Sequence, residues 1–179
     1  GQAKFVVKST SALSAGVHTG LLAFDGDNRY TASQASFNIT IAAGPAIVSP
    51  SNATGAPGAS VNLVAKLKRK TDKSLLAALP INFSIDGVAV GTATTDASGV
   101  ATLVWKEPDS VTIGAHTITA AFAGNKIDFA SSATATLTVN QAATTLKGVN
   151  VKGAIGTSVK FSATLSRNTD KAYLPKVNV

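Results

Sequence analysis

Two histidines are the first candidates for chemistry, because imidazole binds metals and serves as a general acid or base near neutral pH. His18 and His116 are the only histidines, and each occurs in a Gly-x-His-Thr tetrapeptide. Neither a carboxylate nor a second histidine recurs beside them at a spacing suited to a metal site or a catalytic pair. The recurrence of the whole tetrapeptide therefore favours a structural role for both rings.

Asp25-Gly26-Asp27-Asn28 places three oxygen-bearing side chains within four residues. Oxygens of this kind are the ligands that calcium prefers. The corresponding segment further along the chain, residues 123–126, reads Ala-Gly-Asn-Lys and puts a cation where an anion would be needed. We therefore predict a turn here and no metal site. Asp25 and Asp27 are the candidate ligands of this segment if a metal does bind.

The densest positive cluster is Lys66-Leu-Lys-Arg-Lys70. On a strand, Lys66 and Lys68 share one face, and the following turn adds Arg69 and Lys70. Together they would make a patch suited to an acidic glycan, another acidic cell-surface polymer or an acidic neighbouring subunit. The alternative is an edge strand whose lysines prevent pairing with other strands. The related segment near the C-terminus keeps only part of the cluster, which favours the alternative.

The inventory for catalysis is otherwise thin. The chain has no Cys, no Gly-x-Ser-x-Gly motif, no recurrent pair of carboxylates and no phosphate-binding loop that opens a helix. Trp105, the single Trp, alternates with Ala101 and Leu103, which predicts that it fills the core and does not stack on a sugar. We predict that this segment is not an enzyme and carries no cofactor.

The composition indicates a globular β-protein. Hydrophobic residues make up 45% of the chain and charged residues only 14%, and Ala, Thr, Ser, Val and Gly dominate, which favours strands over helices. Residues 141–179 carry six basic groups and one acidic group, so most of the formal charge of +7 belongs to them. With no aromatic platform or recognition helix, we expect no nucleic-acid partner. The longest uncharged run, residues 30–65, is interrupted by three prolines and predicts no membrane span.

The chain repeats itself with a period of 98 residues. Gly16–Thr19 aligns with Gly114–Thr117, and Gly58–Leu63 aligns with Gly156–Phe161, both at this offset. Repeats of a fixed period are typical of arrays of similar structural units. One full repeat is therefore flanked by two incomplete ones.

Within each repeat, apolar residues recur at every second position, which is the pattern of half-buried strands. Turn signals separate these strands, among them Asp86-Gly87 and Asp96–Gly99. About seven short strands in one repeat predict an all-β fold, a Greek-key sandwich of the immunoglobulin type repeated in tandem. The pattern covers residues 61–67, 81–85, 101–105, 116–122 and 133–139.

Three segments carry a resemblance to a known family: Val90–Ala101, the Gly-x-His-Thr openings at Gly16 and Gly114, and Phe24–Ser33. On these residues the chain resembles the bacterial Ig-like repeats found in long tandem arrays on surface and secreted proteins. The resemblance extends over essentially the whole chain. It implies tandem Ig-like sandwiches, and it is less specific about function, since members serve as spacers, stalks, adhesin modules and appendages of enzymes.

The Ig-like prediction gives the histidines a definite place. In immunoglobulin domains a Tyr near the start of one strand bonds back to the backbone a few residues upstream. The Gly-x-His-Thr motif puts His18 and His116 where that Tyr would be. We therefore predict that each histidine is a structural corner.

The repeat divides the chain into three parts. Residues 1–42 are predicted to be the C-terminal half of an Ig-like repeat, 43–140 a complete repeat, and 141–179 the N-terminal half of a further repeat. Each half alone would expose unpaired strand edges and a core face. Either the chain continues in both directions, which we favour, or half-repeats of successive copies join into a head-to-tail polymer.

We therefore expect an architectural role outside the cell, secreted or at the cell surface. The repeats would form a stalk, fibre or filament stabilised by contacts between neighbours. The expected partners are neighbouring Ig-like repeats or copies of the chain itself. The alternatives are an adhesin or carbohydrate-binding module, or a non-catalytic accessory domain of a secreted enzyme.

Overall fold

The structure is a computed structural model that describes residues 15–174 of the chain. This range contains strands and no helix, so it holds no helix that could cross a membrane. The strands are β1 (Gly16–Phe24), β2 (Ser33–Ile41), β3 (Gly44–Pro50), β4 (Ala53–Gly55), β5 (Ser60–Arg69), β6 (Pro80–Ile85), β7 (Val88–Thr94), β8 (Val100–Lys106), β9 (Gly114–Phe122), β10 (Asp128–Phe129), β11 (Ser131–Val139), β12 (Thr144–Gly148) and β13 (Ala163–Arg167).

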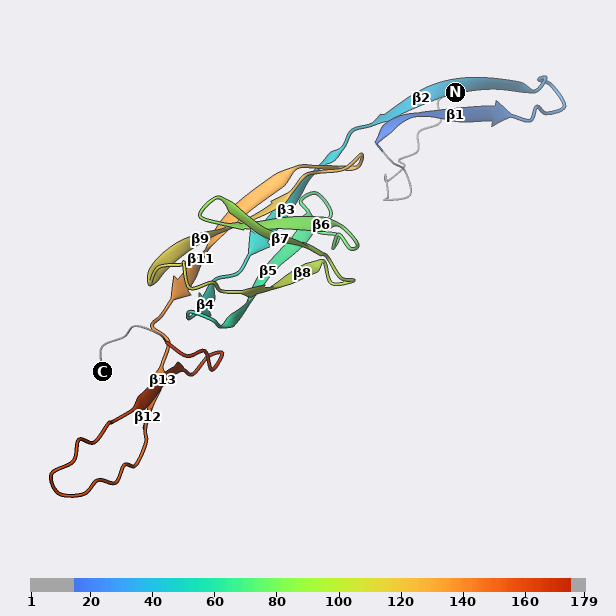
Figure 1. Ribbon diagram of the computed structural model, residues 1–179. Helices are drawn as coiled ribbons and strands as arrows, with labels where there is room; N and C mark the ends of the chain where they lie inside the picture. The colour runs from blue at the N-terminus through green and yellow to red at the C-terminus, as the bar shows by residue number, and fades with distance from the viewer. Residues whose placement is uncertain (1–14, 175–179) are drawn as a thin grey trace.

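Two sheets pack face to face in the middle of the chain and form a β-sandwich (Figure 1). One sheet has the strand order β10-β3-β5-β8, and the other has the order β4-β11-β9-β6-β7. Neighbouring strands are antiparallel except for β3 with β10 and β4 with β11, which are parallel. The all-β sandwich predicted from the period of two is confirmed.

The core lies between the two sheets and is built from the alternating apolar residues. In β5 the side chains of Val61, Leu63, Ala65 and Leu67 are buried, whereas the residues between them are wholly or partly exposed. Phe83 of β6 is the largest side chain that is fully buried. Burying a large apolar side chain of this kind stabilises the fold by about 1.5–3 kcal/mol.

Two predicted turns are confirmed within the sandwich. Asp86 and Gly87 have φ angles of 47° and 82°, and positive φ at both positions is what a type I′ turn between β6 and β7 requires. The carboxylate of Asp96 accepts hydrogen bonds from the N–H groups of Ser98 and Val100 at 2.8 and 2.9 Å. That side chain thereby closes the turn before β8.

The N-terminal hairpin β1–β2 repeats the hairpin β9–β11. All four strands have nine residues. The pairing registers also agree, because Gly16 faces Ile41 as Gly114 faces Val139. The repeat found in the sequence is thus also a repeat of backbone structure.

The C-terminal hairpin β12–β13 repeats the pairing of β3 with β5. Thr144 faces Arg167 as Ala46 faces Arg69. The lysine four residues after each of these arginines has the same φ of 61°. Residues 144–167 therefore adopt the same strand pairing as residues 46–69.

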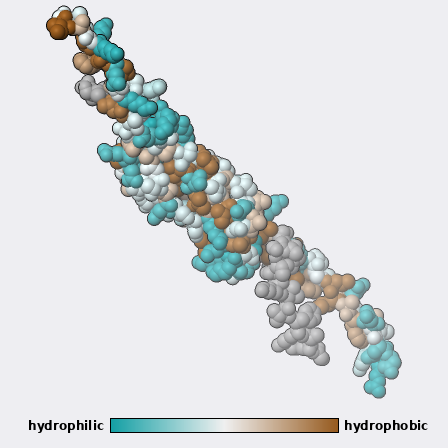
Figure 2. All heavy atoms as spheres, turned by 90° about the horizontal axis from the view of Figure 1, so that it is seen from below, coloured by the Kyte–Doolittle hydropathy of each residue, from teal (hydrophilic) through white to brown (hydrophobic). Residues whose placement is uncertain are grey.

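The two hairpins extend from opposite ends of the sandwich, so the described part of the chain is elongated (Figure 1). Only residues 42–43 separate β2 from β3, and residues 140–143 separate β11 from β12. Phe24 in the N-terminal hairpin is 46% exposed, whereas its equivalent in the complete repeat, Phe122, is 3% exposed. Figure 2 shows hydrophobic residues on the surface of both end segments. Each hairpin thus carries an apolar face that the complete repeat buries.

Candidate functional site

The densest polar contacts lie where β13 meets the end of the sandwich. Arg167, the last residue of β13, donates through Nε and Nη2 to the two carboxylate oxygens of Asp170 at 2.9 and 2.7 Å. Its Nη1 donates to Asp109, in the loop after β8. These hydrogen bonds, to Asp170 first and then to Asp109, raise the pKa of Arg167, and the guanidinium holds the pKa of Asp170 well below its usual range. Arg167 therefore ties the C-terminal hairpin to the sandwich.

A second set of contacts fixes the same boundary. The Thr169 hydroxyl donates to the carbonyl oxygen of Pro57 at 2.7 Å. Gly58 has a φ of 76°, and a Cβ there would lie 2.6 Å from Oδ2 of Asp170 and 2.8 Å from Nη2 of Arg167. The positive φ favours glycine at this position, and a larger residue would displace the side chains of Arg167 and Asp170. We call this set of residues the C-terminal junction: Pro57, Gly58, Asp109, Arg167, Thr169 and Asp170.

Arg69 is the equivalent of Arg167 in the complete repeat. Its Nε and Nη2 donate to the carboxylate of Asp128 on β10 at 2.7 and 3.2 Å, and Nη1 donates to Asp72 at 3.3 Å. The side chains of Arg69 and Asp128 are only 11% and 2% exposed. The hydrogen bond to Asp128 raises the pKa of Arg69 despite its burial. Its charge is thus neutralised within the fold, which separates it from the predicted basic patch.

The three lysines of that patch face solvent. Lys66 and Lys68 project from the outer face of β5, the first exposed and the second half-buried, and Lys70 is exposed in the following turn. The expectation of an edge strand protected by lysines is wrong, because β5 lies between β3 and β8. Alternation reports which face of a strand is buried and carries no information about its edges. Binding of an acidic polymer by these lysines stays a prediction.

Glu107 is a buried carboxyl group next to the C-terminal junction. It is 1% exposed, and within residues 15–174 neither of its carboxylate oxygens has a hydrogen-bond partner. Burial raises the pKa of Glu107, and the charge of His116 opposes this shift. Gly55 makes room for the side chain, since a Cβ at that position would collide with Oε2 of Glu107. The fold thus favours the neutral form of this group.

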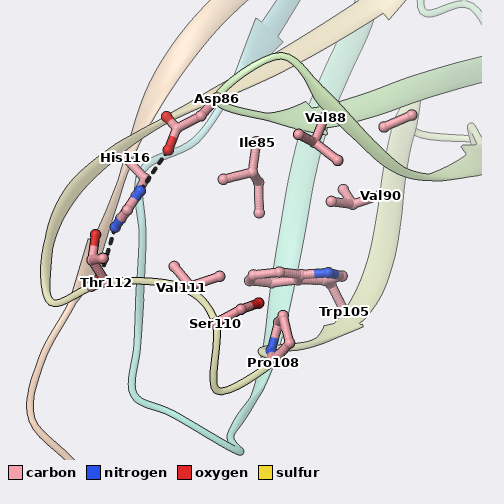
Figure 3. A pocket seen from close by; sticks show the side chains of 11 residues that line it. Ile85, Asp86, Val88, Val90, Trp105, Pro108, Ser110, Val111, Thr112 and His116 are labelled. Atoms are coloured by element: carbon pink, nitrogen blue, oxygen red, sulfur yellow. Dashed lines mark hydrogen bonds and ion pairs between the residues drawn. The ribbon is translucent and has the colours of Figure 1, made fainter.

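A pocket of about 560 Å³ opens between β7, β8 and the loop that follows β8 (Figure 3). Trp105 forms one wall, and Ile85, Val88 and Val90 lie across from it. Trp105 packs against the core, as predicted, but it also lines this pocket and remains partly exposed. The loop closes one side with Pro108, Ser110, Val111 and Thr112.

His116 links two sides of the pocket. Its Nδ1 lies 2.6 Å from Oδ2 of Asp86, and its Nε2 lies 2.7 Å from the carbonyl oxygen of Thr112 (Figure 3). Both partners are acceptors, so a ring that makes both bonds carries a proton on each nitrogen. The hydrogen bond to Asp86 and, after it, the bond to Thr112 raise the pKa of His116. The bond between His116 and Asp86 also lowers the pKa of Asp86. In this state neither ring nitrogen can act as a base.

The predicted turn at the tip of the N-terminal hairpin is confirmed. Asp27 accepts hydrogen bonds from the N–H groups of Arg29 and Tyr30, both at 2.8 Å, and Asn125 makes the equivalent bonds at 2.7 Å. The Asp27 carboxylate is thus used by the turn, and Asp25 is exposed beside it. Across the described range, no three His, Asp or Glu side chains come together as a metal site requires.

Sequence reasoning did not single out Glu107 or Asp109. In the 98-residue alignment they correspond to Ser9 and Ser11, so the comparison of repeats gave no reason to select them. The recurrence of Arg167 and Asp170 at the positions of Arg69 and Asp72 is the one signal that points to the junction. His18, half-buried in β1, is the equivalent of His116, and its corner role stays a prediction.

The fold defines a class of protein, those built on an immunoglobulin-type β-sandwich, which here carries a hairpin at each end through a short linker. The family model described as "Bacterial Ig-like domain (group 3)" matches residues 48–140, just over half of the chain. The chain belongs to this family of bacterial Ig-like domains. Membership confirms the predicted fold and points to a non-catalytic domain.

One similar solved structure is titled "Crystal structure of tetra-tandem repeat in extending region of large adhesion protein". It is 21% identical to this chain with a TM-score of 0.45. The match covers 88% of this chain and 40% of that one, so the chain spans about two fifths of the length of that structure. No curated protein matches the chain.

Proposed function

We propose that this chain is a section of a tandem-repeat protein outside the cell, in which Ig-like repeats form a stalk, fibre or filament. The observation that carries the proposal is the C-terminal junction. There, one repeat and the start of the next share the Arg167–Asp109 ion pair and the Thr169–Pro57 hydrogen bond across a linker of residues 140–143. Contacts between nearest neighbours are what stabilises an array of this kind.

In this proposal residues 1–42, 43–140 and 141–179 are the end of one repeat, a complete repeat and the start of a third. The strand registers shared by the hairpins and the complete repeat support this division, although residues 1–14 and 175–179 lie outside the described range. The apolar faces of both hairpins would be covered by the remainder of their own repeats. Neighbouring repeats are therefore the proposed partners, and copies of the chain are the alternative.

Two experiments on the source organism test this. Protease treatment of intact cells should remove the protein from the surface, or the protein should be found in the medium. Protection in intact cells with cleavage only after lysis would overturn the extracellular assignment. A denatured mass far above the 18.0 kDa of this chain would support one long array, and a mass near that value would support completion of half-repeats between copies.

A second candidate function is adhesion through an acidic glycan, favoured by the solvent-facing cluster of Lys66, Lys68 and Lys70. Titration of a sulfated polysaccharide at low salt, against the chain and a variant with all three lysines changed to Ser, tests it. Binding that the substitutions abolish would support an adhesin. Absence of binding would leave the architectural role. If this segment is an accessory domain of a secreted enzyme, the natural protein should contain a catalytic domain in the same chain.

A further inference from the structure

Two strand edges lie on one side of the sandwich without a partner strand in the described part of the chain. β7 pairs only with β6, and β8 pairs only with β5, so each presents backbone N–H and C=O groups along its other edge. Exposed edges in natural proteins are commonly protected by charged residues or proline. β7 contains neither, since its sequence is Val-Ala-Val-Gly-Thr-Ala-Thr. An edge of this kind can pair with an added extended chain.

The pocket described above lies directly beside the edge of β7. Val88, Ala89 and Val90 of β7 line it, and Trp105 of β8 forms the opposite wall (Figure 3). Val88 is 69% exposed, so the entrance is open to solvent. The volume of about 560 Å³ falls within the range of ligand pockets in proteins. One stretch of backbone therefore offers both main-chain pairing and a hollow for a side chain.

The polar atoms at the rim are already engaged. Oδ2 of Asp86 is bonded to His116, and Oδ1 accepts from the N–H of Thr117 at 2.8 Å. Both nitrogens of His116 are used by Asp86 and Thr112. The hydroxyls of Ser110 and Thr112 and the indole N–H of Trp105 are the polar side-chain groups left in the lining, and the lining side chains other than these and the engaged pair are apolar. A sugar would need several hydrogen bonds for its hydroxyls, whereas an apolar side chain needs none, so this lining favours an apolar occupant.

We propose that this pocket and the free edge of β7 together bind an extended polypeptide segment that carries a large apolar or aromatic side chain. The side chain enters between Trp105 and the valines of β7, and the backbone of the segment pairs with the edge. The site adjoins the C-terminal junction, since Pro108 lines the pocket and the next residue, Asp109, binds Arg167. The whole pocket lies within residues 85–116, so it exists whether or not the chain forms a stalk.

Trp105 is the only Trp, so its fluorescence reports on this pocket alone. The probe is a capped hexapeptide of alternating Thr and Val in which the second Val is replaced by Phe. It is titrated into the full chain. We expect a saturable change in the emission. Replacing the Phe of the peptide by Ser, or methylating the amides that face β7, should each weaken binding by at least about tenfold, because one removes the buried side chain and the other the edge hydrogen bonds.

Variants of the chain locate the site. Val88→Asp places a charge at the entrance and on the edge strand and should abolish the response. Val104→Asp is the matched control, because Val104 is 66% exposed and lies outside the pocket, and it should bind as the wild type does. Trp105→Phe keeps an aromatic wall and should bind more weakly, read from amide chemical shifts of β7 by NMR. Circular dichroism confirms that each variant is folded.

Several results would overturn the proposal. The folded chain could fail to respond to the Phe peptide, or it could bind the amide-methylated peptide equally well. The Val88 and Val104 variants could also lose binding to the same extent. A panel of neutral oligosaccharides is titrated in parallel. Saturable binding of a sugar at Trp105 in place of the peptide would identify a saccharide site and refute the peptide site.

Discussion

The ion pair between Arg69 and Asp128 is the polar contact whose loss should most destabilise the complete repeat. Asp128→Ala removes the two shortest bonds of a guanidinium that is only 11% exposed. Removing one partner of a buried ion pair costs about 3–5 kcal/mol. Because Asp72 still contacts Arg69, we expect a loss near the lower limit, about 3 kcal/mol.

Urea and thermal unfolding of the full chain, followed by circular dichroism and Trp105 fluorescence, measure this loss. A decrease of about 3 kcal/mol should lower the melting temperature of a domain of this size by roughly 12–24 °C. The urea midpoint should fall while the dependence of the unfolding free energy on urea stays the same. Fluorescence confines the measurement to the complete repeat, since Trp105 lies there.

The matched control is Asp72→Ala. It removes the third bond of the same Arg69, a contact of 3.3 Å from a side chain that is 41% exposed. It also removes a hydrogen bond from the N–H of Ser74 at 3.1 Å, likewise at the surface, so its effect should still be far smaller. Equal shifts for the two variants, or a loss below about 1 kcal/mol for Asp128→Ala, would refute the assignment of Arg69 as a buried structural residue. Arg69 would then return to the basic patch as a group available to an acidic ligand.

Three further predictions concern the junction and the titrating groups. Gly58→Ala and Gly87→Ala both place a Cβ at positive φ, but only at Gly58 does it meet the C-terminal hairpin, so hydrogen exchange in β12 and β13 should accelerate in the first variant alone. The pKa of His116 is raised in the fold, so its stabilisation is complete below the unfolded value of about 6.5 and is lost as pH rises through the folded value. The wild-type melting temperature should therefore fall above about pH 6.5 more steeply than that of His116→Asn, and equal slopes would contradict this. Burial raises the pKa of Glu107, so stability should decline as pH rises above about 4.5, and Glu107→Gln should remove that decline in the same assay.

Most of the complete repeat could be predicted from its sequence because each strand buries one face. In residues 61–67 and 81–85 every second side chain is apolar and faces the core, and a strand with one buried face has only one register that keeps its apolar set inside. Asp86-Gly87 and the Asp96 turn could be predicted because few residue types adopt those backbone conformations. Internal repetition added the equivalence of the hairpins.

Other features lie beyond such patterns. The position of β5 between two strands depends on how distant segments pair, which alternation does not report. Glu107 is buried beside Gly55, which is distant in the sequence, and the contact between Asp109 and Arg167 joins residues 58 positions apart. The pocket beside Trp105 is formed by residues of β7, β8 and the loop after β8, and β7 and β8 belong to different sheets. All of these are tertiary relations between segments that are individually unremarkable.

Single-molecule force spectroscopy of the natural protein tests the central claim most directly. Full extension of a 98-residue repeat at about 3.6 Å per residue gives about 35 nm. We predict a regular series of unfolding events whose contour-length increments are a few nanometres below about 35 nm, because each folded repeat already spans part of that length. A single event, or increments without a common length, would contradict an array of equivalent Ig-like repeats.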